Sequence, residues 1–180
     1  MDRRRQLRDR VEEAAAAFTG ALRLAAPRWT EPVFLEDPGA PIPGQREAWS
    51  ARDIAEHVLS VDRMNAEAAA RTVAEGVPID LRAHVRQLPD WDWGNRSFAW
   101  LSLATADEAV AAWDGQVGSR LEFIERLAER DLERPAGMNE QALAYMAGRG
   151  VPVANIVEGI LLFCAEHARD HAHQLRERFA

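Results

Sequence analysis

Apolar residues recur at spacings of three and four along most of this chain, and the alternating pattern of a half-buried strand is almost absent. The helical pattern covers four long segments, residues 3–26, 50–75, 105–128 and 152–180. Pro27 is expected to end the first segment, and Ser50 with Asp53 has the spacing of a capping box at the start of the second. Pro152 suits the first turn of the fourth. The pattern predicts an all-α helical bundle in a single domain, 1–180.

Three long connections join the helical segments. Residues 27–49 hold five prolines and are expected to form an extended crossing loop. Residues 77–104 contain a short helical stretch at 79–88 and a cluster of aromatic residues, and residues 130–151 contain another short helical stretch. Connections of this length exceed simple hairpin links and often carry function.

The composition excludes several classes of protein. A single cysteine, Cys164, rules out a disulfide framework or a cysteine-based zinc ribbon within one chain and favours a reducing, cytoplasmic environment. All 22 basic residues are arginine, which removes Schiff-base chemistry and any lysine general base. The net charge of −7 argues against a nucleic-acid partner. No apolar run reaches the roughly 18 residues needed to span a membrane.

Three of the five histidines have the features expected of metal ligands. His167 and His171 stand one turn apart on one face of the last segment, and His57 lies on the apolar stripe of the second. Inward-facing imidazoles are costly unless they are hydrogen-bonded or bind a metal. At a rise of about 1.5 Å per residue, His57 and His171 reach the same level only if the second and fourth long helices run antiparallel. A metal site therefore excludes a simple up-down-up-down bundle, and hydrogen-bonded core histidines are the alternative.

Three residues near these histidines are candidates for supporting roles. Asp53 and Asp170 each lie within one turn of a candidate ligand and are candidates to orient an imidazole. The alternatives are a capping partner for Asp53 and a solvated helix position for Asp170. Cys164 stands one turn before His167, where either a soft metal ligand or, more commonly, a small buried apolar residue is expected.

The aromatic residues of the second connection are candidates for a substrate pocket. Trp91, Trp93 and Trp100 are predicted to wall an apolar pocket, and the alternatives are a dimer contact or rings that hold the loop against the bundle. His84 lies in the same connection, and His173 is expected on the surface because it points away from the face of the histidine pair.

Two motifs resemble those of a known family. Residues 49–58, WSARDIAEHV, are similar to the second-helix motif of the DinB/YfiT-like family, in which a Trp, a small capping residue, a basic–acidic pair and a His recur in this order. Residues 166–175, EHARDHAHQL, resemble its last-helix motif. Residues 106–136 resemble its third helix and exit loop, so the resemblance extends over most of the chain. Residues 138–150 and the Trp-rich connection follow the family pattern less closely.

This resemblance implies a DinB/YfiT-like four-helix bundle with long crossover connections that binds one divalent metal ion through His57, His167 and His171. Zinc or nickel suits three imidazoles, and iron and manganese are also compatible. Relatives in the family include bacillithiol and mycothiol S-transferases, a mycothiol-dependent maleylpyruvate isomerase and resistance proteins that act on reactive natural products. A metal held by three neutral imidazoles keeps an open position, at which it lowers the pKa of a thiol or of water.

The first functional hypothesis is a cytoplasmic metalloenzyme that activates a low-molecular-weight thiol, or water, for attack on a small electrophilic substrate, as in detoxification. Mycothiol is the thiol suggested by the Arg-only, Ala-rich composition. The alternatives are a metal-dependent hydrolase, a resistance protein that sequesters a reactive natural product, and a non-catalytic small-molecule binder. A small-molecule partner is expected, with no nucleic-acid or membrane partner, and the family suggests a homodimer.

Overall fold

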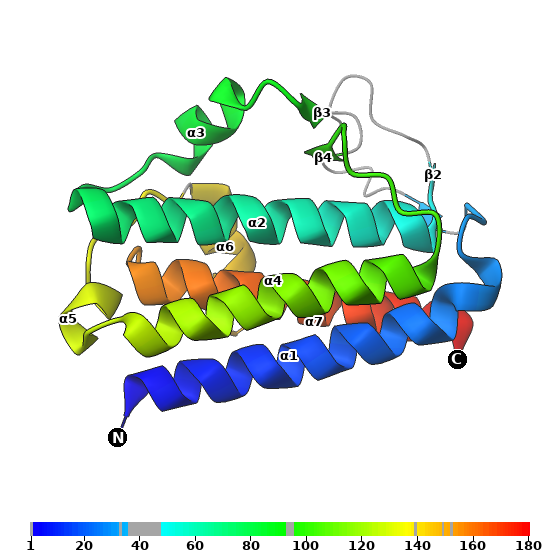
Figure 1. Cartoon of the computed structure of the whole chain (residues 1–180), viewed down its shortest axis with the longest axis horizontal. Helices are drawn as coiled ribbons and strands as arrows, with labels where there is room; N and C mark the ends of the chain where they lie inside the picture. The colour runs from blue at the N-terminus through cyan, green and yellow to red at the C-terminus, as the bar shows by residue number, and fades with distance from the viewer. Residues whose placement is uncertain are drawn as a thin grey trace.

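The computed structural model describes residues 2–32, 34–35, 48–92, 96–138, 140–148, 150–151 and 153–180. Four long helices form a bundle: α1 (Arg3–Ala25), α2 (Ala51–Glu75), α4 (Ala106–Arg126) and α7 (Val157–Phe179). Helices α1 and α7 run in one direction, and α2 and α4 run in the opposite direction (Figure 1). Around the bundle, each helix contacts its neighbours in the order α1, α7, α2, α4. The predicted all-α fold, with the second and fourth long helices antiparallel, is confirmed.

Local sequence signals account for where several of these helices begin and end. The Ser50 hydroxyl accepts the Asp53 N–H at 3.2 Å, and the Asp53 carboxylate accepts the Ser50 N–H at 2.8 Å, which completes the predicted capping box. Thr105 caps α4 in a similar way, because its hydroxyl accepts the Glu108 N–H at 3.2 Å. Gly76 ends α2 in the left-handed conformation, with φ of 72°.

Helix α7 starts later than the sequence suggested. The predicted start followed Pro152, whereas the helix begins at Val157. The residues just before it bind another segment: the Ala136 N–H donates to the Asn155 carbonyl at 2.9 Å, and the Val157 N–H donates to the Arg134 carbonyl at 3.0 Å. The prediction from the proline was wrong because these bonds to the exit loop of the third long helix hold residue 155 outside the helix.

Apolar side chains from all four long helices fill the centre of the bundle. Phe18 of α1 lies edge-to-face against Trp113 of α4, with ring centroids 5.1 Å apart. Other large side chains that are fully buried in these helices are Leu7, Leu22, Ile54, Leu59, Ile124, Ile160, Leu161 and Leu175. Full burial of one such side chain stabilises the fold by about 1.5–3 kcal/mol. This core holds α2 and α7 together at a defined register.

Shorter elements lie in the connections. They are η1 (Ala26–Arg28), α3 (Leu81–Gln87), α5 (Glu129–Leu132) and α6 (Glu140–Gly148). The connections also contain two antiparallel pairs of short strands. One pair is β1 (Phe34–Leu35) with β2 (Ala48–Trp49), and the other is β3 (Trp91–Asp92) with β4 (Ser97–Phe98). Figure 1 shows α3 and the β3–β4 hairpin beside α2, on its side away from α1. The second long connection therefore covers an outer face of α2.

A buried ion pair joins α4 to α2 in the interior of the bundle. Arg120 of α4 binds the carboxylate of Asp62 on α2, and the two side chains are 1% and 4% exposed. The buried Cys164 thiol of α7 interacts electrostatically with the same carboxylate. Three of the long helices therefore meet at Asp62.

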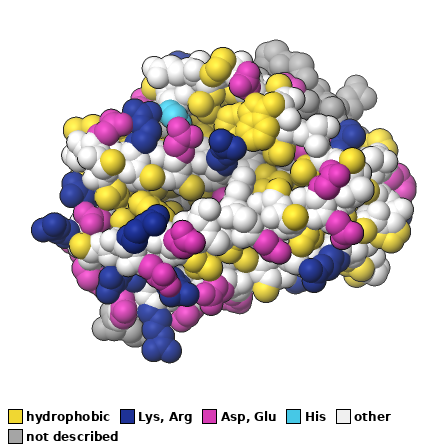
Figure 2. All heavy atoms as spheres, viewed as in Figure 1, with side chains coloured by type: hydrophobic (Ala, Val, Ile, Leu, Met, Phe, Trp, Pro, Cys, Tyr) yellow, Lys and Arg dark blue, Asp and Glu magenta, His cyan; other side chains and the backbone are white. Residues whose placement is uncertain are grey.

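The face of the molecule seen in Figure 2 carries interspersed acidic and basic side chains, with a hydrophobic patch over the β3–β4 hairpin. Trp100 is 51% exposed in this part of the molecule, and the guanidinium carbon of Arg63 lies 5.0 Å from its ring centroid. Among the helices in the described part of the chain, none is both long enough and apolar enough to cross a membrane.

Candidate metal centre

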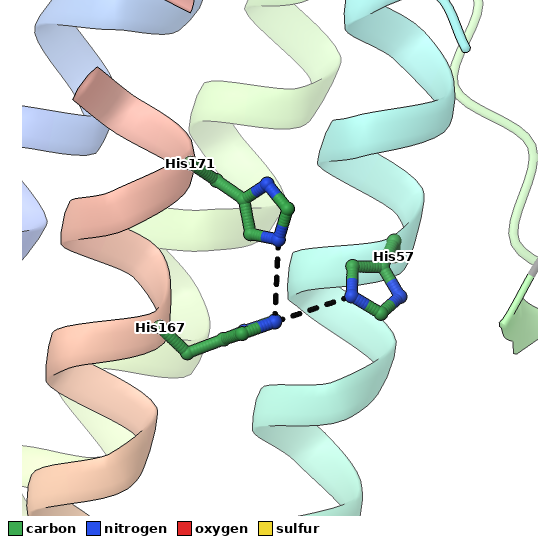
Figure 3. Close-up of side chains that lie close together, drawn as sticks. All are labelled: His57, His167 and His171. Carbon is green, nitrogen blue, oxygen red and sulfur yellow. Dashed lines mark hydrogen bonds between the residues drawn. The ribbon is translucent and has the colours of Figure 1, made fainter. Parts of the chain in front are cut away.

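Three histidine side chains meet between α2 and α7 (Figure 3). His57 comes from the first half of α2, and His167 and His171 come from successive turns of α7. The Nε2 atom of His167 lies 3.2 Å from Nε2 of His57 and 3.2 Å from Nε2 of His171. One ring nitrogen of each residue lies within 4.8 Å of the others. Nitrogen ligands at about 2.0–2.1 Å from a tetrahedral zinc ion stand about 3.3 Å apart, so both short spacings suit a shared ion.

Hydrogen bonds hold the other ring nitrogen of two of these histidines. The Nδ1 atom of His57 lies 2.8 Å from the backbone carbonyl oxygen of Arg96. Because a carbonyl oxygen only accepts, Nδ1 of His57 carries the proton. The Nδ1 atom of His171 lies 2.9 Å from the side-chain oxygen of Gln174, which also accepts. In the neutral rings, Nε2 of both histidines therefore presents a lone pair to the centre of the cluster.

These lone pairs bear on the alternative that the histidines are only hydrogen-bonded core residues. Nε2 of His167 contacts two nitrogens that carry no proton, and a neutral imidazole has at most one N–H to donate from that position. Hydrogen bonding therefore satisfies at most one of the two close contacts. A cation accepts all three lone pairs, so the donor set fits a divalent metal ion better than it fits a hydrogen-bonded cluster.

Burial keeps the rings of His57 and His167 neutral. His57 is 8% exposed and His167 is 9% exposed. Burial and the neighbouring His171 lower the pKa of His57 to about 3. The same two causes, with His57, lower the pKa of His167 well below its ordinary value. Because a metal binds the neutral imidazole, neither of these two rings has to lose a proton first at neutral pH.

Aromatic rings surround the histidine cluster. The Trp49 ring lies against His57 with centroids 5.1 Å apart, and Phe163 stacks on His167 at 5.5 Å. Tyr145 of α6 contacts Phe163 edge-to-face at 5.7 Å. Its hydroxyl also donates a hydrogen bond to the carboxylate of Asp170. Helix α6 is thereby attached to α7 directly beside the candidate ligands.

Sequence comparison places this fold and this cluster in a known group. The family model described as the DinB superfamily matches residues 3–175. The chain belongs to the DinB superfamily. Comparisons with curated proteins and with solved structures gave no match. The matched range includes all four long helices nearly in full and the whole histidine cluster, and it confirms the resemblance found in the motifs at 49–58 and 166–175.

In this DinB protein the three candidate supporting residues contact other groups as follows. Asp53 completes the cap of α2. Asp170 accepts the hydroxyl of Tyr145. Cys164 is buried near Asp62, and burial raises the pKa of its thiol far above the ordinary value. A backbone carbonyl and a glutamine contact Nδ1 of His57 and of His171. The supporting roles of Asp53, Asp170 and Cys164 stay predictions.

Of the tryptophans predicted to wall a pocket, Trp91 lies in β3 and Trp100 follows β4. Trp91 contacts Phe98 edge-to-face at 5.5 Å, and Phe98 stacks on Trp100 at 5.3 Å. Trp93 lies outside the described residues. The two described tryptophans therefore form one aromatic cluster along α2, and their contact with a substrate stays a prediction.

Sequence reasoning gave no role to three residues that contact the cluster or its neighbours. Gln174 follows His171 by three positions, a spacing that places both on one helix face, so a signal for this contact was present. Arg96 contacts His57 through its backbone carbonyl, and the sequence cannot indicate such a contact because every residue type has this group. Tyr145 is the single tyrosine of the chain, within a short predicted helix. Its contact with α7 depends on how that helix packs.

Proposed function

We propose that this DinB protein binds one divalent metal ion through the Nε2 atoms of His57, His167 and His171 and is a metal-dependent enzyme. Its proposed reaction is the attack of a low-molecular-weight thiol, or of water, on a small electrophilic substrate. The observation that carries the proposal is the convergence of three Nε2 atoms, two of which present lone pairs because their Nδ1 atoms are held as donors.

A divalent ion held by three neutral imidazoles keeps its full positive charge and an open coordination position, where it lowers the pKa of a thiol or of water. Three nitrogen donors suit zinc or nickel, and iron and manganese are the next candidates. Burial raises the pKa of the Cys164 thiol and disfavours the thiolate that binds a metal, so the proposed ligand set contains no sulfur from this residue.

The residues around the cluster contribute orientation and exclusion of water. The Arg96 carbonyl and the Gln174 side chain fix the ring orientation of two ligands, as partners of metal-binding histidines commonly do. Trp49 and Phe163 cover two of the imidazoles and lower the local dielectric constant. A low dielectric constant strengthens the interaction between a bound cation and a developing anionic nucleophile.

A thiol transferase is the first form of the proposal. The thiol sulfur forms a bond to the electrophilic carbon, the leaving group departs with its electron pair, and the thiol proton passes to solvent. Mycothiol is the proposed thiol, which rests on the Arg-only, Ala-rich composition and on the family resemblance alone. In the hydrolase form, water takes the place of the thiol.

Elemental analysis of protein purified without an affinity tag or chelator tests the metal site. About one divalent ion per chain is expected, and the His57→Ala/His171→Ala double variant should lose it. His173→Ala is the matched control, because His173 lies on the same helix but points to solvent, with its side chain 70% exposed and paired with Glu177. Failure to bind zinc, nickel, manganese or iron after reconstitution would refute the metal-dependent proposal.

Turnover assays separate the forms of the proposed function. The metal-loaded protein is incubated with an aryl halide electrophile, with and without a low-molecular-weight thiol. A transferase consumes one thiol for each halide released, whereas a hydrolase forms product without thiol. Binding of one electrophile molecule per chain, with no product formed, would instead identify a sequestering protein. His57→Ala should abolish turnover while remaining helical by circular dichroism.

A further inference from the structure

The β3–β4 hairpin and the residues after it are attached to the helix face that carries His57. The Phe98 N–H donates to the Ser60 hydroxyl at 3.0 Å. The Leu103 N–H donates to the Glu56 carboxylate at 2.9 Å. Because Glu56 and Ser60 lie one turn apart on α2, these bonds hold the connection on both sides of His57.

Arg96, which directly precedes β4, has an uncommon backbone conformation. Its φ is 51°, and among the described residues no other non-glycine residue has a positive φ. The left-handed region is unfavourable for most L-residues, whereas glycine and asparagine adopt it more readily. The carbonyl of Arg96 is also the group that accepts the Nδ1–H of His57, at 2.8 Å. The conformational cost therefore falls on the residue that orients a candidate metal ligand.

We propose that Arg96 is a positioning residue, whose left-handed backbone places the carbonyl that holds His57 with its proton on Nδ1. With the proton on Nδ1, the Nε2 lone pair of His57 points into the histidine cluster. Without this acceptor, the ring also populates the tautomer with its proton on Nε2, which has no lone pair there. The metal-affinity part of this inference rests on the proposed function, and the tautomer part does not.

The Arg96 side chain offers a competing explanation, because its charge lies near enough to disfavour protonation of His57. Three substitutions separate the backbone from the guanidinium. Arg96→Gly and Arg96→Asn remove the charge but tolerate the left-handed conformation. Arg96→Val removes the same charge and disfavours that conformation strongly, because valine is β-branched. Any difference between valine and the other two variants therefore reports on the backbone.

Proton–nitrogen correlation spectra of metal-free protein with isotope-labelled histidine read the tautomer directly, and the signals of His57 are assigned by their absence in His57→Ala. Wild type, Arg96→Gly and Arg96→Asn should keep the proton on Nδ1, and Arg96→Val should show a mixture. Metal affinity, measured against a competing chelator, should fall about 10- to 100-fold in Arg96→Val and change less than about threefold in the other two.

Two results would overturn the proposal. An equal loss of affinity in all three variants would assign the effect to the guanidinium, and an unchanged tautomer in Arg96→Val would remove the role of the backbone. Should Arg96→Val not fold, Arg96→Ala replaces it, because alanine also disfavours the left-handed region but less strongly. A wild-type chain that binds no metal would refute the proposed function, and the tautomer spectra would still test Arg96.

Discussion

The Nε2 atoms of His57 and His167 lie 3.2 Å apart, although 110 positions separate the two residues in the chain. This contact joins α2 to α7, and it exists because the two helices run antiparallel at a register that the apolar core maintains. A slip of one helical turn, about 5.4 Å, would separate the two nitrogens. The histidine cluster is therefore sensitive to the stability and register of the whole bundle.

Metal binding should stabilise the folded chain. A ligand that binds only the folded state adds about 2.7 kcal/mol at a free concentration one hundred times its Kd. Zinc added to metal-free protein should raise the melting temperature, and a chelator should reverse the rise. The effect should vanish in His171→Ala and persist in His173→Ala. A rise of equal size in His171→Ala would show that the ion binds elsewhere.

Acidification should destabilise the metal-free protein. Burial lowers the pKa of His57 from 6.5 to about 3, so between these values the unfolded chain binds a proton that the folded chain does not. Stability therefore falls as pH falls through this window, by about 2 kcal/mol between pH 7 and pH 5 from this residue. Urea unfolding at the two pH values measures the difference. His57→Gln should show a smaller pH dependence, and equal dependence in both proteins would contradict the assignment.

Breaking the buried ion pair should cost far more than breaking a surface pair. Arg120→Met leaves the Asp62 carboxylate in the core without its cation, and a loss of about 3–5 kcal/mol in unfolding free energy is expected. The double variant Asp62→Leu/Arg120→Met should recover much of this loss. Glu75→Gln is the control, because Glu75 pairs with Arg71 at the surface and the change should cost less than about 1 kcal/mol. If Arg120→Met cost no more unfolding free energy than Glu75→Gln, the pair of Arg120 and Asp62 would not be shielded from water.

Two glycines inside α4 should be sites of stabilisation. Beyond its chain neighbours and the adjacent backbone of α4, a Cβ atom added at Gly115 or Gly118 meets no atom within 4 Å, and both positions are helical. Replacing either with alanine should raise the unfolding free energy by about 0.5–1 kcal/mol, because glycine loses more backbone freedom on folding. Gly76→Ala should do the opposite, since Gly76 has φ of 72°. Thermal unfolding of the three variants measures both the expected increase and the expected decrease in stability.

The thiol of Cys164 should be inert in the folded protein. It is 2% exposed, and burial raises its pKa, so almost no thiolate exists at neutral pH. A thiol-reactive chromophore should label the native chain only slowly and should label one thiol per chain after unfolding in guanidinium chloride. Fast labelling of the native chain would mean that the thiol is accessible from solvent.

The long helices were predictable because their signals are local. Apolar spacing and the Ser50–Asp53 cap act within one or two turns, and the helical segment predicted at 50–75 closely matches α2. The start of α7 was not predictable from Pro152, because hydrogen bonds from the segment at 134–136 hold the preceding residues in another conformation. A proline is compatible with the first turn of a helix, but it does not by itself determine where the helix begins.

At the candidate metal site too, some features follow from local sequence and others from tertiary contacts. His57, His167 and His171 could be identified as candidates from the sequence. His167 and His171 are one turn apart and share a helix face, and His57 is a polar residue on an apolar stripe, where it needs a partner. The groups that orient these rings, and the nitrogen that each ring presents, depend on tertiary contacts. The acceptor for His57 is a backbone carbonyl 39 positions away, and every residue type carries the same carbonyl. Only the packing of the β3–β4 connection against α2 brings that atom within hydrogen-bonding distance, because such an approach depends on long-range contacts rather than on residue identity.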